Sequence, residues 1–141
     1  MPILQRPEYE CEYFVYGSGK KILFCFHGFG NHAEDFNALN GILGEEYTIV
    51  SVNLFFHGKS TVLKHLVDKG FTADQLKELI RQLMDLFPAE KYNWLGFSLG
   101  GRIAMMLTEL FPDRTEKLFL LAPDGLTISP FYRLSTLNVP G

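Results

Sequence analysis

Hydrophobic residues along this chain gather in short runs that are separated by polar and glycine-rich turns. In Lys21–Phe26 the last five positions are all apolar, and Tyr47–Val52 is largely apolar and β-branched, a pattern typical of strands that are buried on both faces. Tyr92–Leu95 and Lys117–Ala122 have the same character, and Cys11–Tyr16 precedes them, followed by a Gly-Ser-Gly turn. The pattern therefore predicts five strands, with Lys21–Phe26 in the middle of a parallel sheet.

Three stretches between these runs have the character of helices. Asn31–Leu43 is a short one closed by Gly44, and Leu99–Phe111 is ended by a following proline. A third runs to Phe87 after Thr72, a residue suited to the N-cap. Its apolar positions recur at helical spacing: Leu76, Leu79, Ile80, Leu83, Met84 and Phe87. Because strands and helices alternate, we expect an α/β fold with a mostly parallel sheet and helices on both faces.

Length and composition fit one globular domain. The chain has 141 residues and is 47% hydrophobic, which argues against a disordered segment. Its net charge of -3 comes from interspersed acids and bases, which argues against nucleic-acid binding. Cys11 and Cys25 have no metal-ligand spacing with the histidines, so we expect free thiols in a reducing compartment, with a structural disulfide as the alternative. Residues 1–10 do not have the pattern of a secretory signal, and no apolar run approaches membrane-spanning length. We therefore expect a cytoplasmic protein without a membrane span.

Residues 96–101, Gly-Phe-Ser-Leu-Gly-Gly, lie between a predicted strand and a predicted helix. A Gly-x-Ser-x-Gly segment in that context places its serine on a sharp, strained turn, where the flanking glycines avoid steric clashes. The hydroxyl of Ser98 is then exposed for nucleophilic attack. The five-residue pattern also arises by chance in a few per cent of chains of this length, so its strand-to-helix setting carries the prediction.

A second glycine-rich segment, His-Gly-Phe-Gly at residues 27–30, directly follows the strand Lys21–Phe26. Ligands of open α/β sheets bind beyond the carboxyl ends of the strands, so a backbone N–H here can point into the same crevice as Ser98. Acyl transfer needs such donors for the developing oxyanion, each contributing about 3 kcal/mol. We expect the N–H groups of Phe29 and Leu99 to be these donors, and the His27 side chain to have a structural role in the turn.

Together these segments resemble the N-terminal half of the α/β-hydrolase family. Three motifs occur in the family's order: residues 27–30 after the third family strand, residues 53–60 (Asn-Leu-Phe-Phe-His-Gly-Lys-Ser) after the fourth, and residues 96–101 at the nucleophile elbow. The resemblance covers about residues 10–125 and implies a sheet that stops after about the sixth family strand. It also implies that Ser98 is the nucleophile and that the Phe29 and Leu99 N–H groups form the oxyanion hole, with no cofactor.

The sequence departs from the family's pattern at two points. The family usually has Asp where this chain has Asn53, a structural turn position. Its general-base histidine lies near the C-terminus after the last strand, a part that these residues do not include. None of the four histidines matches that position: His27, His32, His57 and His65. A serine without a base is a weak nucleophile, so we expect little or no activity from these 141 residues alone.

Asp124 follows the strand Lys117–Ala122, where some members of the family place the acid of the catalytic triad. An ordinary surface acid in a turn before Gly125 explains it about as well. Residues 126–141 fall where many relatives begin a cap or lid over the active site, and a disordered tail is the alternative. Residues 1–125 would then form the hydrolase core.

The sequence therefore predicts a serine hydrolase that cleaves a carboxylester or thioester through an acyl-enzyme. Neighbouring aromatic residues favour a small apolar substrate: Phe29, Phe55, Phe56 and Phe97. The alternative is a non-catalytic binding or assembly module that keeps the fold. In either case the strand Lys117–Ala122 would present a hydrophobic edge suited to self-association.

Overall fold

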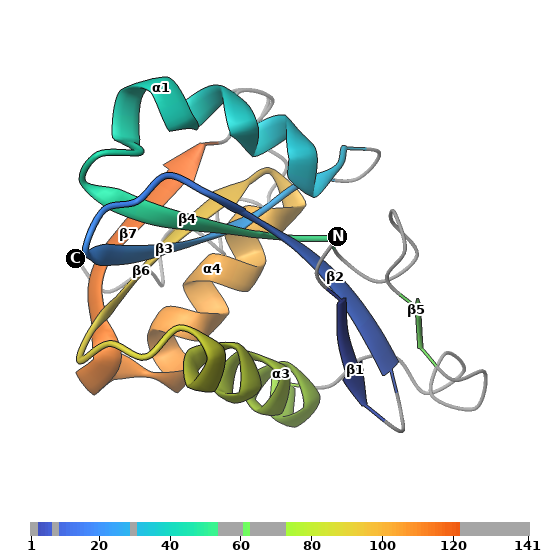
Figure 1. Ribbon diagram of the computed structural model, residues 1–141. Helices are drawn as coiled ribbons and strands as arrows, with labels where there is room; N and C mark the ends of the chain where they lie inside the picture. The colour runs from blue at the N-terminus through green and yellow to red at the C-terminus, as the bar shows by residue number, and fades with distance from the viewer. Residues whose placement is uncertain (1–2, 7–8, 29–30, 54–60, 63–72, 122–141) are drawn as a thin grey trace, which may run out of the picture.

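The fold is a twisted, mostly parallel sheet with helices on both faces (Figure 1). The computed structural model describes residues 3–6, 9–28, 31–53, 61–62 and 73–121. Its elements are β1 (Ile3–Arg6), β2 (Tyr9–Tyr16), β3 (Lys21–Phe26), the 3-10 helix η1 (Ala33–Leu39), α1 (Asn40–Leu43), β4 (Tyr47–Val52), β5 (Thr61–Val62), α3 (Ala73–Leu86), β6 (Tyr92–Phe97), α4 (Leu99–Leu110), the 3-10 turn η2 (Pro112–Arg114) and β7 (Thr115–Leu121).

The strands follow the order β1-β2-β4-β3-β6-β7, and β5 pairs with β2 off this path. β3 lies between β4 and β6 and is parallel to both, and β7 is parallel to β6. β1 and β2 are antiparallel to each other, and β2 is antiparallel to β4. Because β3 and β6 are neighbours, the chain segments that follow them emerge at the same edge of the sheet.

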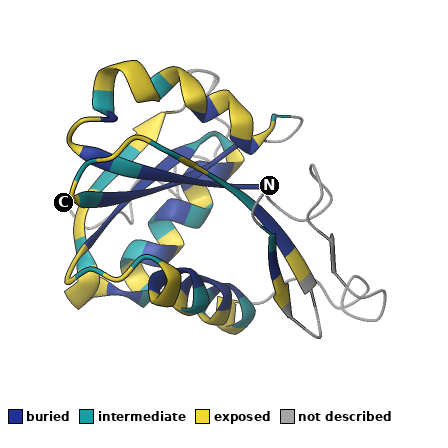
Figure 2. Cartoon of the chain, in the orientation of Figure 1, coloured by how far each residue is buried: buried dark blue, intermediate teal, exposed yellow. Residues whose placement is uncertain are grey.

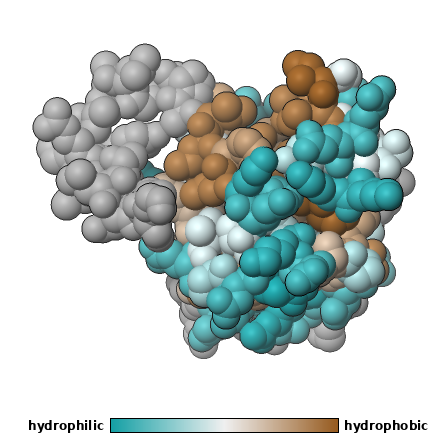
Figure 3. Space-filling model, turned by 90° about the vertical axis from the view of Figure 1, so that its left-hand side faces the viewer, coloured by the Kyte–Doolittle hydropathy of each residue, from teal (hydrophilic) through white to brown (hydrophobic). Residues whose placement is uncertain are grey.

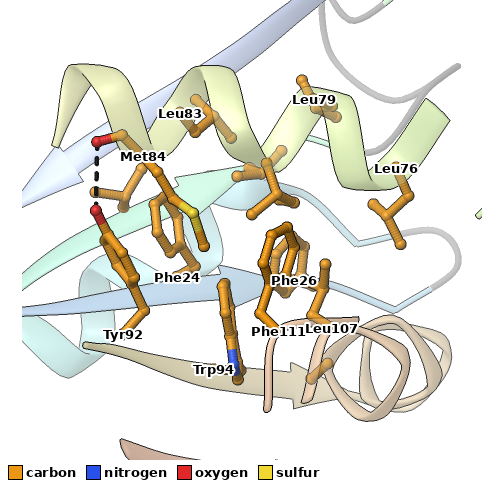
Figure 4. Packing of buried hydrophobic residues seen from close by; sticks show 14 of the residues in the cluster. Phe24, Phe26, Leu76, Leu79, Leu83, Met84, Tyr92, Trp94, Leu107 and Phe111 are labelled. Carbon is orange, nitrogen blue, oxygen red and sulfur yellow. Dashed lines mark hydrogen bonds between the residues drawn. The ribbon is translucent and has the colours of Figure 1, made fainter. Parts of the chain in front are cut away.

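The central strands are buried on both faces, as their continuous apolar runs predict (Figure 2). Residues Phe24, Phe26 and Trp94 point toward α3 and α4, where they meet the apolar stripe of α3 (Figure 4). On the opposite face Leu23 and Ile49 belong to a smaller cluster with residues of η1. Successive side chains of a strand point to opposite faces of the sheet, and here both faces are apolar. Each face is therefore covered by a layer of helices.

Two buried polar groups in the larger cluster have protein partners. The Tyr92 hydroxyl donates to the carbonyl oxygen of Phe87 at 2.8 Å and lies 3.3 Å from that of Met84 (Figure 4). The indole Nε1–H of Trp94 donates to Thr115 Oγ1 at 2.8 Å. These bonds connect β6 to the end of α3 and to the start of β7, and they offset the cost of burying polar atoms.

The sequence prediction was correct for the bounds of β3 and β4 and for an α/β fold with helices on both faces. The helix expected at Asn31–Leu43 is present and ends at Leu43, but it begins at Ala33 and consists of the 3-10 helix η1 followed by the four residues of α1. Within η1 the buried residues Ala33 and Phe36 are three apart, which matches the three residues per turn of a 3-10 helix. The strand β1 was not predicted, because Ile3–Arg6 is too short for its alternation to stand out.

β7 lies at the end of the strand order and pairs with β6 on one side. Leu120 and Leu121 are 40% and 44% exposed, and Ile42 of α1 is 80% exposed. Figure 3, which views the molecule from the left-hand side of Figure 1, shows hydrophobic surface across the upper part of this face. No helix in the described part of the chain is long and apolar enough to cross a membrane.

Candidate functional site

Ser98 occupies the tight junction between β6 and α4. Its φ of 54° and ψ of -115° put it in a region that L-residues rarely adopt, and it is the only non-glycine residue with positive φ in the part of the chain that the structure describes. Such a conformation costs about 1–3 kcal/mol and persists only where the surroundings hold it. Here the Ser98 N–H donates to Leu121 O at 2.9 Å, and the Gly101 N–H donates to Ser98 O at 2.9 Å.

Two glycines of the segment 96–101 are required by close packing. A Cβ at Gly100 would collide with the backbone carbonyls of Phe26 and His27, the latter at 2.8 Å. A Cβ at Gly96 would collide with the backbone of Gly100 and with Cα of the next residue. The start of α4 therefore rests directly on the end of β3, which brings Ser98 close to the loop that follows β3.

That loop is anchored at its first residues. His27 is buried, and because a carbonyl oxygen only accepts, its Nδ1–H donates to Gly28 O at 2.8 Å. Asn31 N–H donates to the same oxygen at 3.1 Å, which closes a turn. A Cβ at Gly28 would lie 3.1 Å from the ring of Phe97, so the loop packs against the residue that precedes Ser98. His27 thus has the structural role expected for it.

A second set of hydrogen bonds holds the first residue of η1. Ala33 N–H donates to Asn53 Oδ1 at 2.7 Å, and the Ser51 hydroxyl donates to Ala33 O. Asn53 Nδ2 donates to Glu12 Oε1 at 2.6 Å, and Asn53 N–H donates to Glu12 O at 2.9 Å. The sequence prediction treated Asn53 as a turn residue and missed Glu12. β2 contains two acids, the exposed Glu10 and the buried Glu12, so the sequence alone held no signal that distinguishes Glu12.

Several predicted residues lie outside the described part of the chain: Phe29, Asp124, His57 and His65. Residues 126–141 do as well, so the predicted boundary at 125/126 stays a prediction. Ser98 and Leu99 are described, and Leu99 is the first residue of α4. Of the two histidines in the described residues, His27 is buried and His32 lies immediately before η1, near the surface.

Among the described residues, the buried cysteines do not offer a second nucleophile. Burial raises the pKa of the Cys25 thiol, so this side chain stays protonated near neutral pH and is inert. Both cysteines are free, as expected. Within the described residues, no three histidine, cysteine, aspartate or glutamate side chains are grouped so that they could hold a metal ion.

An apolar groove adjoins the turn that carries Ser98. It has a volume of about 240 Å³ and lies between η1 and the carboxyl ends of β6 and β7. Its lining residues are His27, Asn31, Asp35, Phe36, Ala38, Leu39, Phe97 and Leu121. Phe97 precedes Ser98, and the Leu121 carbonyl accepts its N–H, so the groove reaches the backbone of Ser98.

Comparison with known proteins gives a family match over most of the chain. The sequence model of the alpha/beta hydrolase fold matches residues 21–141. A pimeloyl-acyl-carrier-protein methyl ester esterase from Salmonella newport is 33% identical over 108 residues, which is 77% of this chain and 39% of that protein. An uncharacterized protein from Mycobacterium tuberculosis is 29% identical over 131 residues, 92% of this chain and 37% of that one.

Solved structures agree with these matches at the level of the fold. A hydrolase from Pseudomonas aeruginosa PA01 superposes with a TM-score of 0.70 at 24% identity, covering 84% of this chain and 44% of that chain. The thioesterase domain from the curacin biosynthetic pathway gives 0.68 at 19% identity, covering 81% and 40%. The chain thus spans well under half the length of the relatives it matches.

Proposed function

Because this chain belongs to the alpha/beta hydrolase fold family, we propose that it carries the nucleophile of a serine hydrolase, and that this nucleophile is Ser98. The observation that carries the proposal is the positive φ of Ser98 at the β6–α4 junction. Strain of this kind is concentrated at functional sites, and this turn has the strand-to-helix context of a nucleophile elbow.

The N-terminus of α4 supports the second element of the proposal, an oxyanion hole. Leu99 is the first residue of α4, and the first N–H groups of a helix have no partner within it. The positive end of the helix dipole also favours negative charge there. We assign the Leu99 N–H as one donor and the Phe29 N–H as the other. The anchoring of Gly28 and Asn31 on either side of residues 29–30 supports the second assignment.

In the proposed reaction, Ser98 Oγ attacks the carbonyl carbon of an ester or thioester while a base accepts its proton. The tetrahedral oxyanion is stabilised by the two N–H donors and collapses, releasing the alcohol or thiol, which takes up the proton. Water then attacks the carbonyl carbon of the acyl-enzyme while the base accepts its proton. The second tetrahedral oxyanion collapses with cleavage of the bond to Ser98 Oγ, which takes up that proton, and the carboxylic acid is released. We propose that Asp124 orients the base.

The base itself is the component that the described residues do not supply. The His27 ring is buried and its Nδ1–H is engaged by Gly28 O, so it is badly suited to accept the Ser98 proton. His32 lies at the start of η1, where its backbone N–H donates to Asp35 Oδ2 at 3.1 Å. His57 and His65 do not match the position of the family's base in the sequence. We therefore propose that these 141 residues have at most trace activity alone, and that a complete site needs a further histidine.

The groove beside the turn supports a small apolar acyl group as substrate. At about 240 Å³ it is smaller than the roughly 300–1,000 Å³ of pockets for drug-sized ligands, and aromatic and aliphatic side chains dominate its lining. The related esterase from Salmonella newport acts on a methyl ester, which is consistent with ester chemistry on this scaffold.

The experiment is intact-mass measurement after exposure to a fluorophosphonate probe, with and without free imidazole as a substitute base. We expect slow labelling that imidazole accelerates, because the nucleophile is present and the base is lacking. Ser98→Ala should abolish the added mass. Ser18→Ala, which removes a hydroxyl from an exposed turn, is the matched control and should label like the parent chain.

If the chain takes up no probe even with imidazole, or if Ser98→Ala labels equally, the hydrolase assignment is wrong. The non-catalytic binding or assembly module would then be the better description. The half-exposed leucines of β7 are the feature that favours this second candidate.

A further inference from the structure

Glu12 of β2 and Asn53 after β4 form a buried polar pair on the strands that hold η1. Both side chains are almost completely buried, at 3% and 1% exposed. Asn53 Nδ2 donates to Glu12 Oε1 at 2.6 Å, and Asn53 Oδ1 accepts from Ala33 N–H at 2.7 Å. Among the described residues, two further titratable side chains contact Asn53: Glu34, whose Oε1 is 3.4 Å from Asn53 Nδ2, and Cys11, whose Sγ is 3.9 Å from Asn53 O.

The chemistry of this pair permits one orientation of the Asn53 amide. A carboxylate accepts hydrogen bonds and a backbone N–H donates, so the amide must turn its Nδ2 toward Glu12 and its Oδ1 toward Ala33. Rotating the amide by half a turn would place two acceptors against each other and two donors against each other. Burial of both side chains away from water makes this preference strong.

Ala33 is the first residue of η1, so fixing its N–H fixes where η1 begins. The chain between the end of β3 and η1 is then held at both ends. Gly28 is bound by the His27 ring and by Asn31 N–H, and Ala33 is bound through Asn53 and the Ser51 hydroxyl.

We propose that Glu12 is a positioning residue for the loop after β3: it orients Asn53, Asn53 fixes Ala33, and the loop is thereby held against the turn that carries Ser98. The inference rests on the proposed function only in its last step, where this loop supplies an oxyanion donor. It also gives a physical reason for Asn at position 53, where the family usually has Asp. Aspartate there would face the Glu12 carboxylate at hydrogen-bond distance and repel it.

The test exchanges donor and acceptor between the two side chains. Asn53→Asp alone should free the loop, because two adjacent carboxylates repel when both are ionised. Glu12→Gln in the same chain should restore the bond, because the Gln amide then donates to the new carboxylate at position 53. Hydrogen exchange of the Ala33 and Asn31 amides reports the loop, and the Leu23 amide in β3 reports global unfolding. We expect exchange of the two loop amides to be about tenfold faster relative to Leu23 in Asn53→Asp, and to return to the parent rate in the double variant.

The pH dependence separates this role from a general loss of packing. The defect of Asn53→Asp should shrink as the pH is lowered, because protonating the new carboxylate at position 53 removes its repulsion from Glu12 and from Glu34. In the double variant the restored bond needs that carboxylate ionised, so lowering the pH should not improve the protection of the loop amides. The matched control is Asn93→Asp, a buried Asn→Asp change in β6, which β4 and β3 separate from β2. Glu12→Gln should not rescue it.

If Asn53→Asp does not fold, rescue of folding by Glu12→Gln serves as the readout. Failure of rescue, or a change at Ala33 that leaves Asn31 unchanged, overturns the proposal. Where the parent chain takes up the fluorophosphonate probe, labelling of Ser98 should follow the same order of variants, and equal labelling in all of them overturns it as well. A parent chain that never labels contradicts the proposed hydrolase function, while the amide measurements still decide the role of Glu12.

Discussion

Gly100→Ala and Gly101→Ala are adjacent substitutions in the first turn of α4 for which we expect opposite effects on stability. A Cβ at Gly100 would point into the backbone at the end of β3, against the carbonyls of Phe26 and His27. A Cβ at Gly101 would meet its nearest neighbour, the Leu120 Cδ2 atom, at an ordinary 3.5 Å. Both residues are buried and lie in α4, so the two substitutions are matched in helix propensity and in exposure.

The expected magnitude follows from these distances. His27 O would lie 2.8 Å from the new Cβ at position 100, whereas non-bonded carbon contacts settle at about 3.5 Å, so α4 would have to move away by at least ~0.7 Å. Overpacking against rigid backbone costs up to about 3 kcal/mol. Replacing Gly by Ala inside a helix returns about 1 kcal/mol. We therefore expect Gly100→Ala to lose about 2 kcal/mol and Gly101→Ala to gain about 0.5–1 kcal/mol.

Urea unfolding followed by the fluorescence of Trp94, the single and fully buried tryptophan, measures both variants. The predicted contrast of about 3 kcal/mol corresponds to a difference of roughly 1.5 M between the unfolding midpoints. Equal midpoints, or a Gly100→Ala variant as stable as its neighbour, would show that α4 does not rest on β3 at this point. The packing argument for the turn at Ser98 would then be refuted.

Three further predictions concern the core, the pH dependence and the sheet edge. Leu83→Ala in the buried stripe of α3 should cost about 3 kcal/mol, and Leu86→Ala, at a position 49% exposed on the same helix, less than about 1 kcal/mol in the same urea assay. Burial raises the pKa of Cys25, so the unfolded thiol loses its proton above about pH 8.5 while the folded one keeps it. The free energy of unfolding should therefore fall as the pH rises beyond that value, and Cys25→Ala should remove most of this slope; an unchanged slope would contradict it. Finally, we expect self-association through β7 that grows with concentration in sedimentation velocity and weakens in Leu120→Lys; a monomer at every concentration would argue against it.

The candidate site was predictable from the sequence where the signal is local. A Gly-x-Ser-x-Gly segment between an apolar run and a helical run predicts the strained turn at Ser98, because strain at the serine and the need for glycine arise within a few neighbouring residues. The role of Glu12 was not predictable in this way. Its partner Asn53 is 41 residues away in the chain, and only the pairing of β2 with β4 brings the two together.

The sequence by itself determined the bounds of β3 and β4 and the alternation of strands and helices, because burial on one face or on both imposes a period that each segment shows on its own. Only the tertiary structure decided that β2 pairs with β4, although β3 is the strand that follows it in sequence. It also decided that Gly100 tolerates no side chain while Gly101 does. Both outcomes depend on which distant backbone lies alongside, and the period of a single segment carries no information about its neighbours in space.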